Sequence, residues 1–305
     1  MTSATDTNRY FGADGICGTV NERVTPQLAL KIGQAAGIVC RKGNHPIVVG
    51  KDTRLPNYML ESVLAGGLLS VGARVFLTGP VPTPGIAMLT RSMRCSLGIM
   101  ITASCQLYEE SGLKLFGPDG VKLSAETERE IEILIDSDLS KKLAKSNEFG
   151  RAERIDGVQD RYIEYAKGTV PKGLQLDGIR VVVDCAYGAA YQVAPQVLQE
   201  LGAEVIPCGV EPNGTNINTN CGFTNQRMLQ DTVHEYRADL GFALDGDADR
   251  VIVCDEQGVV VGNKELEGIF PEWNGDGLAT ALQILALMKV KGMSASQTLQ
   301  QLRRA

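Results

Sequence analysis

The chain has 305 residues, of which 44% are apolar and 22% charged, and its formal net charge is −6. This length predicts two domains or slightly more, with enough apolar side chains to build real cores. Lysine and arginine are scattered along an acidic chain, so we expect no nucleic-acid partner. The polar segment 1–9 has no apolar signal core, and the apolar stretch near the C-terminus is too short for a bilayer, so we expect no membrane partner.

The eight cysteines form no C-x-x-C pair and no zinc-like spacing. Without a secretion signal they are most simply reduced thiols, and we expect a cytoplasmic protein. The two histidines, His45 and His234, lie far apart in the sequence. They leave little material for a histidine metal site or a Ser-His dyad.

The first part of the chain alternates short apolar runs with helical patterns. We expect strands at residues 47–50, 74–77 and 97–102. A helix is expected over residues 56–71, because Pro56 suits a first helical turn and Gly72 the position past the end. Ser124 is a good N-cap for a further helix that runs to about Ile135.

A second unit repeats this plan. We expect strands at residues 179–184 and 204–207 and a helix within residues 190–201. The connection from helix to strand has a similar sequence in both units, Val71-Gly72-Ala73 in the first and Leu201-Gly202-Ala203 in the second. This repeat suggests two α/β units of similar topology. The segment between them, residues 136–157, is polar and charged. We therefore expect two domains, at residues 1–150 and 151–255.

An acidic loop stands between two apolar runs of the second unit. Residues 240–244 are followed by Asp245-Gly246-Asp247-Ala248-Asp249-Arg250, and a second apolar run begins at Val251. Three carboxylates at alternate positions of a compact loop can converge on one hard cation. Arg250 adds a fixed positive charge, as a neighbouring phosphate requires. An ordinary acidic turn is the alternative interpretation.

Several motifs resemble, in the same order, those of the α-D-phosphohexomutases. They are residues 9–15, Lys51-Asp52-Thr53-Arg54, Pro82-Thr83-Pro84, Thr102-Ala103-Ser104, residues 112–120, Asn216-Ile217-Asn218 with Cys221-Gly222, and residues 245–250. They cover most of residues 8–262. The chain is most similar to the bacterial members that act on glucosamine phosphates. The resemblance implies two complete α/β domains, each a mixed sheet with flanking helices.

The resemblance also implies a reaction. In this family a phosphoserine, here at Ser104, gives its phosphoryl group to a hexose monophosphate and takes the other phosphoryl group back from the bisphosphate. The implied reaction interconverts glucosamine 6-phosphate and glucosamine 1-phosphate, so the expected substrate is a hexosamine phosphate. Such a transfer needs positioning and neutralised charge more than covalent chemistry.

The same resemblance assigns roles to further residues. One Mg²⁺ per chain is implied, held by the phosphoserine at Ser104 and by Asp245, Asp247 and Asp249. Lys114 can donate or accept the sugar hydroxyl proton if its surroundings lower its pKa. Arg250 is expected to steady the phosphate.

The chain departs from the family pattern near this site. Cys105-Gln106-Leu107 replaces His-Asn-Pro after the serine, and Cys17 replaces an arginine that is expected to face phosphate. Ala248 stands where the family has a second glycine. If this position has a positive φ, alanine strains the loop by about 1 kcal/mol.

The resemblance changes after residue 262. Residues 275–283 resemble the last helix of the family's third domain, so residues 256–305 are expected to be a remnant of that domain, with the fourth domain absent. A helix from Asp276 to Val290 is apolar nearly all round and is expected to expose an apolar face. Such a face suggests a homo-oligomer or pairing with a full-length mutase.

Two alternatives to an active mutase stay open at this point. The chain can be a degenerate remnant, catalytically weak or inactive, that acts as a binding or oligomerising protein. It can also be a small magnesium phosphatase in which water removes the phosphoryl group from Ser104.

Overall fold

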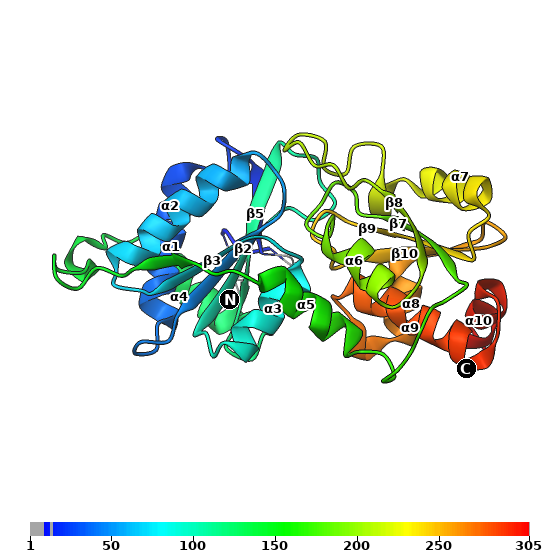
Figure 1. The fold of residues 1–305 in the computed structure, drawn as a ribbon. Coiled ribbons are helices and arrows are strands. Elements are labelled where there is room, and N and C mark those ends of the chain that lie inside the picture. Colours follow the sequence, from blue (N-terminus) through cyan, green and yellow to red (C-terminus); the bar gives the residue numbers. More distant parts are fainter. Residues whose placement is uncertain (1–8, 13–14, 305) are drawn as a thin grey trace, which may run out of the picture.

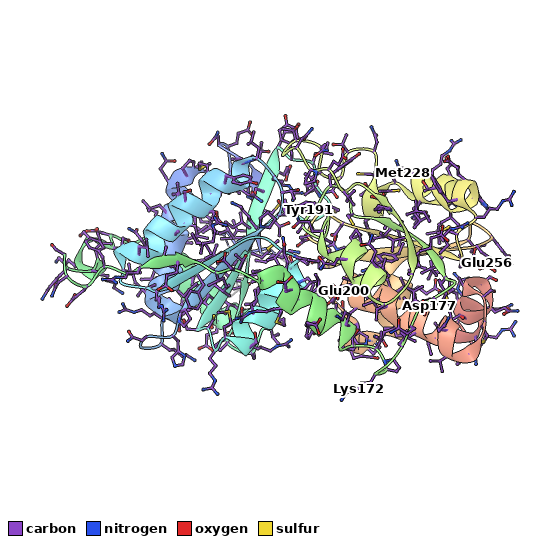
Figure 2. The ribbon with its side chains drawn as sticks, in the orientation of Figure 1. Lys172, Asp177, Tyr191, Glu200, Met228 and Glu256 are labelled. Carbon is purple, nitrogen blue, oxygen red and sulfur yellow. The ribbon has the colours of Figure 1, made fainter. Side chains whose placement is uncertain are left out.

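The computed structural model describes residues 9–12 and 15–304, which form two α/β units side by side (Figure 1). Residues 1–8, 13 and 14, and with them part of the motif expected at residues 9–15, lie outside the described part. The chain passes between the units through α5 (Val158–Lys167). Lys167 Nζ of α5 lies 2.7 Å from Glu200 Oε2, and this ion pair joins α5 to α6 (Val193–Glu200). Glu200 is labelled in Figure 2.

The first unit contains a six-stranded mixed sheet with the order β1-β5-β4-β2-β3-β6. Its strands are β1 (Ile16–Thr19), β2 (Ile47–Lys51), β3 (Val75–Pro80), β4 (Leu97–Ile101), β5 (Glu110–Phe116) and β6 (Ala152–Arg154). β2, β3, β4 and β6 run parallel, and β5 is antiparallel to both β4 and β1. β2 and β4 are buried along their whole length, as central strands with both faces covered must be.

Helices cover both faces of this sheet. α1 (Pro26–Cys40), α2 (Pro56–Ser70) and α4 (Ala125–Ile135) lie on one face, and α3 (Thr83–Ser92) lies on the other. α1 and α2 approach so closely that a Cβ on Gly67 would lie 2.3 Å from the Leu30 carbonyl oxygen. The predicted cap of α4 is confirmed, because Ser124 Oγ accepts a hydrogen bond from Thr127 N (3.2 Å).

The second unit contains a five-stranded sheet with the order β11-β10-β9-β7-β8. Its strands are β7 (Arg180–Asp184), β8 (Glu204–Cys208), β9 (Leu240–Leu244), β10 (Val251–Asp255) and β11 (Val260–Val261). β7, β8 and β9 are parallel, and β10 is antiparallel to β9 and β11. α7 (Gln226–Tyr236) covers one face. The repeated joint predicted from sequence is confirmed, since Gly72 and Gly202 both have a positive φ, of 80° and 89°.

The segment after β11 consists of α8 (Asn263–Ile269), α9 (Gly277–Lys291) and α10 (Ala295–Leu302). Most of α9 is buried, with Leu282 and Leu285 fully so, in the core that also contains α5, α6 and the second sheet. The expectation of an exposed apolar helix face is therefore wrong. The segment before α9 carries the chain back to the sheet, where Gly277 N donates to the Ala248 carbonyl (3.1 Å). No partner is needed to bury this helix.

Two further contacts lie at the predicted domain limits, which stay a prediction. β6 pairs with β3, so the first sheet extends past the boundary expected after residue 150. α9 and α10, within the predicted third-domain remnant at residues 256–305, pack in a core that also contains strands of the second sheet. Within the described ranges no single helix is long and apolar enough to cross a bilayer; α9 and α10 reach that length only together, across a bend of 107°.

Candidate active site

The acidic loop at residues 245–250 joins β9 to β10 and contacts the first unit. Its turn is tight, because Ala248 N donates to the Asp245 carbonyl (3.0 Å) and Ala248 has a φ of 60°. This left-handed conformation strains an alanine by about 1 kcal/mol, as its place in the sequence predicts. Gly246 is required by close approach, since a Cβ there would lie 2.7 Å from the Ser104 carbonyl oxygen.

The three aspartates of the loop converge, with one ligand oxygen of each within 4.8 Å of the others. Asp245 Oδ1 accepts from a backbone N–H of the loop (3.2 Å). Asp247 Oδ2 accepts from Thr83 Oγ1 (2.5 Å), and Asp249 Oδ2 accepts from Lys114 Nζ (2.5 Å). The remaining oxygens, Asp245 Oδ2, Asp247 Oδ1 and Asp249 Oδ1, are buried without a hydrogen-bond partner. Burying such oxygens is unfavourable, and a hard divalent cation such as Mg²⁺ fits them.

The electrostatics of the cluster favour the same ion. Burial and the charges of Asp249 and Asp247 raise the pKa of Asp245. Burial and the charge of Asp247 likewise raise the pKa of Asp249. For Asp247, burial also acts upward, but Lys114 and Thr83 outweigh it and hold its pKa below the ordinary value. The single charge of Lys114 therefore does not neutralise the three carboxylates, and a bound cation would stabilise their ionised forms.

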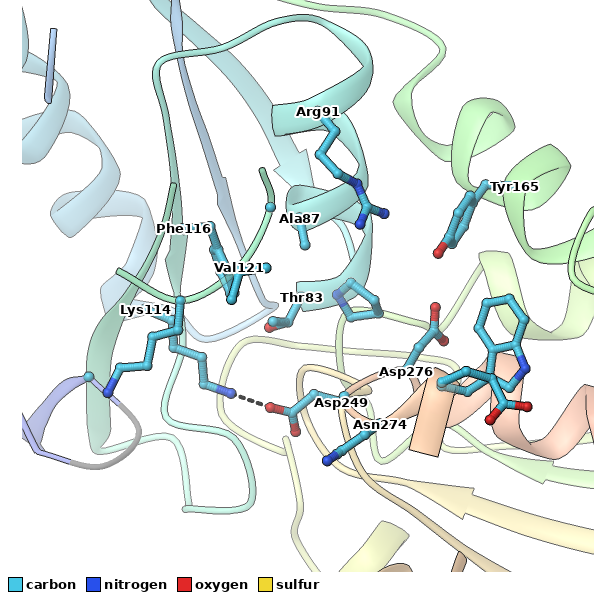
Figure 3. A pocket seen from close by; sticks show the side chains of 17 residues that line it. Thr83, Ala87, Arg91, Lys114, Phe116, Val121, Tyr165, Asp249, Asn274 and Asp276 are labelled. Carbon is cyan, nitrogen blue, oxygen red and sulfur yellow. Dashed lines mark hydrogen bonds and ion pairs between the residues drawn. The ribbon is translucent and has the colours of Figure 1, made fainter. Parts of the chain in front are cut away.

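Lys114 projects from β5 into this cluster. Its Nζ lies 2.7 Å from Asp247 Oδ2 and 2.5 Å from Asp249 Oδ2, and the contact with Asp249 is drawn in Figure 3. Burial acts to lower the pKa of Lys114, but attraction to Asp247 and Asp249 outweighs it and raises the pKa well above the ordinary value. The lowered pKa considered from sequence is therefore not found, and Lys114 is a charged donor in this arrangement.

Ser104 lies in the loop after β4 and is 7% exposed. It has a φ of 47°, in the left-handed region, and its N–H donates to Thr102 Oγ1 (3.0 Å). Its carbonyl oxygen accepts from Arg54 Nη2 (3.1 Å) and from Asn218 Nδ2 (2.8 Å). The Ser104 loop is thus fixed against the second unit, beside Gly246 of the acidic loop.

Arg250 links the two loops. Its Nη1 lies 3.7 Å from Cys105 Sγ, and its Nε lies 3.9 Å from Asp249 Oδ1. The guanidinium therefore stands between the acidic loop and the residue that follows Ser104. All the site residues predicted from sequence meet at this interface between the units.

A cavity of about 410 Å³ opens beside Lys114 and Asp249. Its walls come from α3, β5, α5 and residues 272–276, and Arg91, Tyr165 and Asp276 line it (Figure 3). This volume is typical of small-molecule sites, and cationic, aromatic and carboxylate groups stand together around it. Residues 272–276 were not expected to contribute to the site.

Three contact residues were missed by sequence reasoning. Thr83, Arg54 and Asn218 all stand in motifs that the sequence made visible, but no role was assigned to them. Each acts through a contact across a loop or across the two units, as in the hydrogen bond from Thr83 Oγ1 to Asp247 Oδ2. The motifs themselves were the only signal that could have found them.

The chain is a two-unit α/β protein in which a serine loop of the first unit faces an acidic loop of the second. The chain belongs to the phosphoglucomutase/phosphomannomutase family, because the family's α/β/α domain I matches residues 8–142 and its α/β/α domain II matches residues 160–258. It is 57% identical over 281 residues to phosphoglucosamine mutase of Nitrobacter winogradskyi, covering 91% of this chain and 63% of that protein. It is 53% identical over 304 residues to phosphoglucosamine mutase of Rhizobium etli, covering 95% and 68%.

The fold is also that of a solved structure. The crystal structure of a phosphoglucomutase/phosphomannomutase family protein from Burkholderia thailandensis matches with a TM-score of 0.80, over 94% of this chain and 78% of that chain. At 20% sequence identity, this match shows the shared fold. The chain spans less than two thirds of the length of the Nitrobacter relative.

Proposed function

We propose that the chain interconverts glucosamine 6-phosphate and glucosamine 1-phosphate through a phosphoserine at Ser104. The observation that carries this proposal is the meeting of the Ser104 loop with the three-aspartate loop at the interface between the units. The amino sugar is supported by the identity of 57% and 53% to two phosphoglucosamine mutases. Because the chain spans 63% of the first of them, both the activity and the substrate are proposals for this chain.

The proposed chemistry moves one phosphoryl group at a time. The bond from phosphorus to Ser104 Oγ breaks while a bond to a sugar hydroxyl oxygen forms, and the hydroxyl proton ends on Ser104 Oγ. The bisphosphate then turns round, and its other phosphoryl group returns to Ser104 while the proton returns to the sugar oxygen. In-line positioning and charge neutralisation supply the rate.

The neighbouring residues have separate roles in this scheme. Lys114 and Arg250 place positive charge beside the phosphoryl oxygens. Asp245, Asp247 and Asp249 would hold Mg²⁺ together with the phosphoserine, and a bound divalent cation draws charge from the phosphoryl oxygens. The cavity beside Lys114 would take the sugar, with Arg91 available for the phosphate that does not react.

Location and partners are part of the same proposal. All eight cysteines are unpaired thiols, which fits a reducing compartment and therefore the cytoplasm. Pairing with a second copy or with a full-length mutase would have to use a surface other than the buried face of α9. The hexosamine phosphate is the partner that the site supports.

A mutase assay on the purified chain tests the proposal. It uses glucosamine 6-phosphate, Mg²⁺ and a trace of a hexose bisphosphate, with an intact homologue as the positive control. We expect glucosamine 1-phosphate to form, Ser104→Ala to abolish phosphoryl transfer and Asp247→Ala to abolish the dependence on Mg²⁺. Turnover by Ser104→Ala equal to that of the unaltered chain would reject the assigned role.

The same assay separates the other two interpretations. Transient labelling of Ser104 with release of inorganic phosphate and no sugar product would identify a phosphatase. A folded chain that binds Mg²⁺ and gives neither labelling nor product would identify an inactive remnant.

A further inference from the structure

The Ser104 loop is held at two backbone carbonyls by side chains from both units. Arg54 of the first unit donates through Nη2 to Ser104 O (3.1 Å) and to Gln106 O (2.6 Å). Asn218 of the second unit donates through Nδ2 to the same two oxygens, at 2.8 Å and 2.7 Å. The two donors therefore fix the same pair of oxygens from opposite sides of the interface.

Both donors are themselves immobilised. Arg54 is fully buried and forms an ion pair with Asp52, which in turn accepts from Thr102 Oγ1 (2.7 Å). Asn218 is 4% exposed, has a φ of 58°, and its backbone N–H donates to the Ala186 carbonyl (2.9 Å). Arg54 cannot leave the loop without breaking its buried ion pair with Asp52, and the buried backbone of Asn218 holds its amide at the interface.

We infer that Asn218, acting with Arg54, is a positioning residue that aims Ser104 at the three-aspartate loop. This inference rests on the proposed function. Ser104 has a φ of 47°, which an ordinary residue adopts only when its surroundings hold it there. Fixing its carbonyl oxygen in this conformation fixes the direction of the side chain on the same Cα. Asn218 also belongs to the unit that carries the aspartates, so it sets the serine relative to them.

The inference predicts a loss of rate without a loss of metal binding. The Asn218 amide bonds to Ser104 O and Gln106 O, and within the described part of the chain it forms no hydrogen bond with Asp245, Asp247 or Asp249. The Mg²⁺ affinity of the unphosphorylated chain is therefore expected to depend on it little. A displacement of about 1 Å in a reacting group can lower a rate about 100-fold. We expect removal of the Asn218 amide to slow phosphoryl transfer to Ser104 by about 10- to 100-fold.

Asn218→Gly is the test variant, because glycine keeps the left-handed backbone and removes the side chain that carries the amide. Asn220→Gly is the matched control: Asn220 has a φ of 54° and lies exposed in the same loop. Asn218→Asp adds a second comparison, because a carboxylate of the same shape cannot donate to two carbonyls. We expect the labelling rate to fall in the order asparagine, glycine, aspartate.

Four measurements are made on each variant. They are the rate of Ser104 labelling by a hexose 1,6-bisphosphate, the ³¹P resonance of the phosphoserine, the Mg²⁺ affinity and the melting temperature. A positioning role predicts slower labelling and a shifted or broadened ³¹P resonance in Asn218→Gly, with Mg²⁺ affinity like that of Asn220→Gly. A labelling rate in Asn218→Gly within two-fold of Asn220→Gly overturns the inference. Unaltered chain that is never labelled at Ser104 overturns the proposed function, and the inference with it.

Discussion

Lys114 Nζ lies 2.7 Å from Asp247 Oδ2, and this contact joins β5 of the first unit to the acidic loop of the second. The side chain of Lys114 is 12% exposed and that of Asp247 is fully buried. The pair therefore connects the two units and neutralises part of a buried cluster of like charge. We therefore expect the Lys114 ammonium group to affect both the free energy of unfolding and the stabilisation that Mg²⁺ binding gives.

Replacing Lys114 by methionine is expected to destabilise the metal-free protein by about 3–5 kcal/mol, because buried carboxylates lose their counter-charge. Saturating Mg²⁺ should recover more stability in this variant than in the unaltered chain. Chemical unfolding with and without Mg²⁺ measures both effects. Lys167→Met is the control, since its partners Glu164 and Glu200 have side chains that are 72% and 36% exposed, and such solvent-exposed pairs contribute less than about 1 kcal/mol each. Equal losses in the two variants would contradict the assigned role.

Thr83→Val is expected to weaken Mg²⁺ binding by about 10- to 100-fold, the usual effect of removing a partner of a metal ligand. Thr83 Oγ1 donates to Asp247 Oδ2 and so orients the carboxylate whose other oxygen is unpaired. Valine keeps the shape of the side chain but cannot donate. Titration calorimetry with Mg²⁺ measures the affinity, and Thr83→Ser should retain most of it. Unchanged affinity in the valine variant would show that Thr83 does not orient the ligand.

Asp276 gives the protein a pH-dependent stability. Burial raises the pKa of Asp276 to about 6, although Ala279 N and Tyr162 Oη–H donate to it. In the unfolded chain an aspartate releases its proton at roughly pH 4. Between these values the folded state holds a proton that the unfolded state has lost, so the free energy of unfolding falls as pH rises through this window, by roughly 3 kcal/mol in all.

Asp276→Asn tests this assignment, because asparagine keeps an acceptor oxygen for Ala279 N and Tyr162 but cannot ionise. Unfolding free energies at several pH values from 4 to 7 should fall with pH in the unaltered chain and fall less in the variant. Parallel pH profiles for the two proteins would refute the raised pKa.

Leu285→Ala is expected to destabilise the protein by about 2–5 kcal/mol, because it opens a cavity in a core that includes α9. Leu285 is fully buried, whereas Val290 at the end of the same helix is 67% exposed. Val290→Ala is therefore the control and should change stability by less than about 0.5 kcal/mol. Denaturant unfolding monitored by circular dichroism measures both. A small effect of Leu285→Ala would mean that α9 does not pack on the second sheet.

Local patterns predicted much of the site. The apolar run before residue 245, the spacing of the aspartates and the joints at Gly72 and Gly202 depend on neighbours in sequence, so they could be recognised along the chain. Ala248 was a candidate for a positive φ before its φ of 60° was known. The exposed apolar face predicted for α9 was wrong. A helix that is apolar all round is expected to be buried, but its sequence does not show which elements bury it.

By itself the sequence determined the two α/β units, most of their strands and helices, and the residue types that can hold a cation and a phosphoryl group. Only the tertiary structure decided how they act together. Three contacts join segments that lie more than 100 residues apart in the sequence: Lys114 with Asp247, Thr83 with Asp247, and Asn218 with Ser104. The first of them keeps Lys114 protonated. Charge interactions and hydrogen bonds depend on distances of a few ångströms, and those distances are set by packing across the interface.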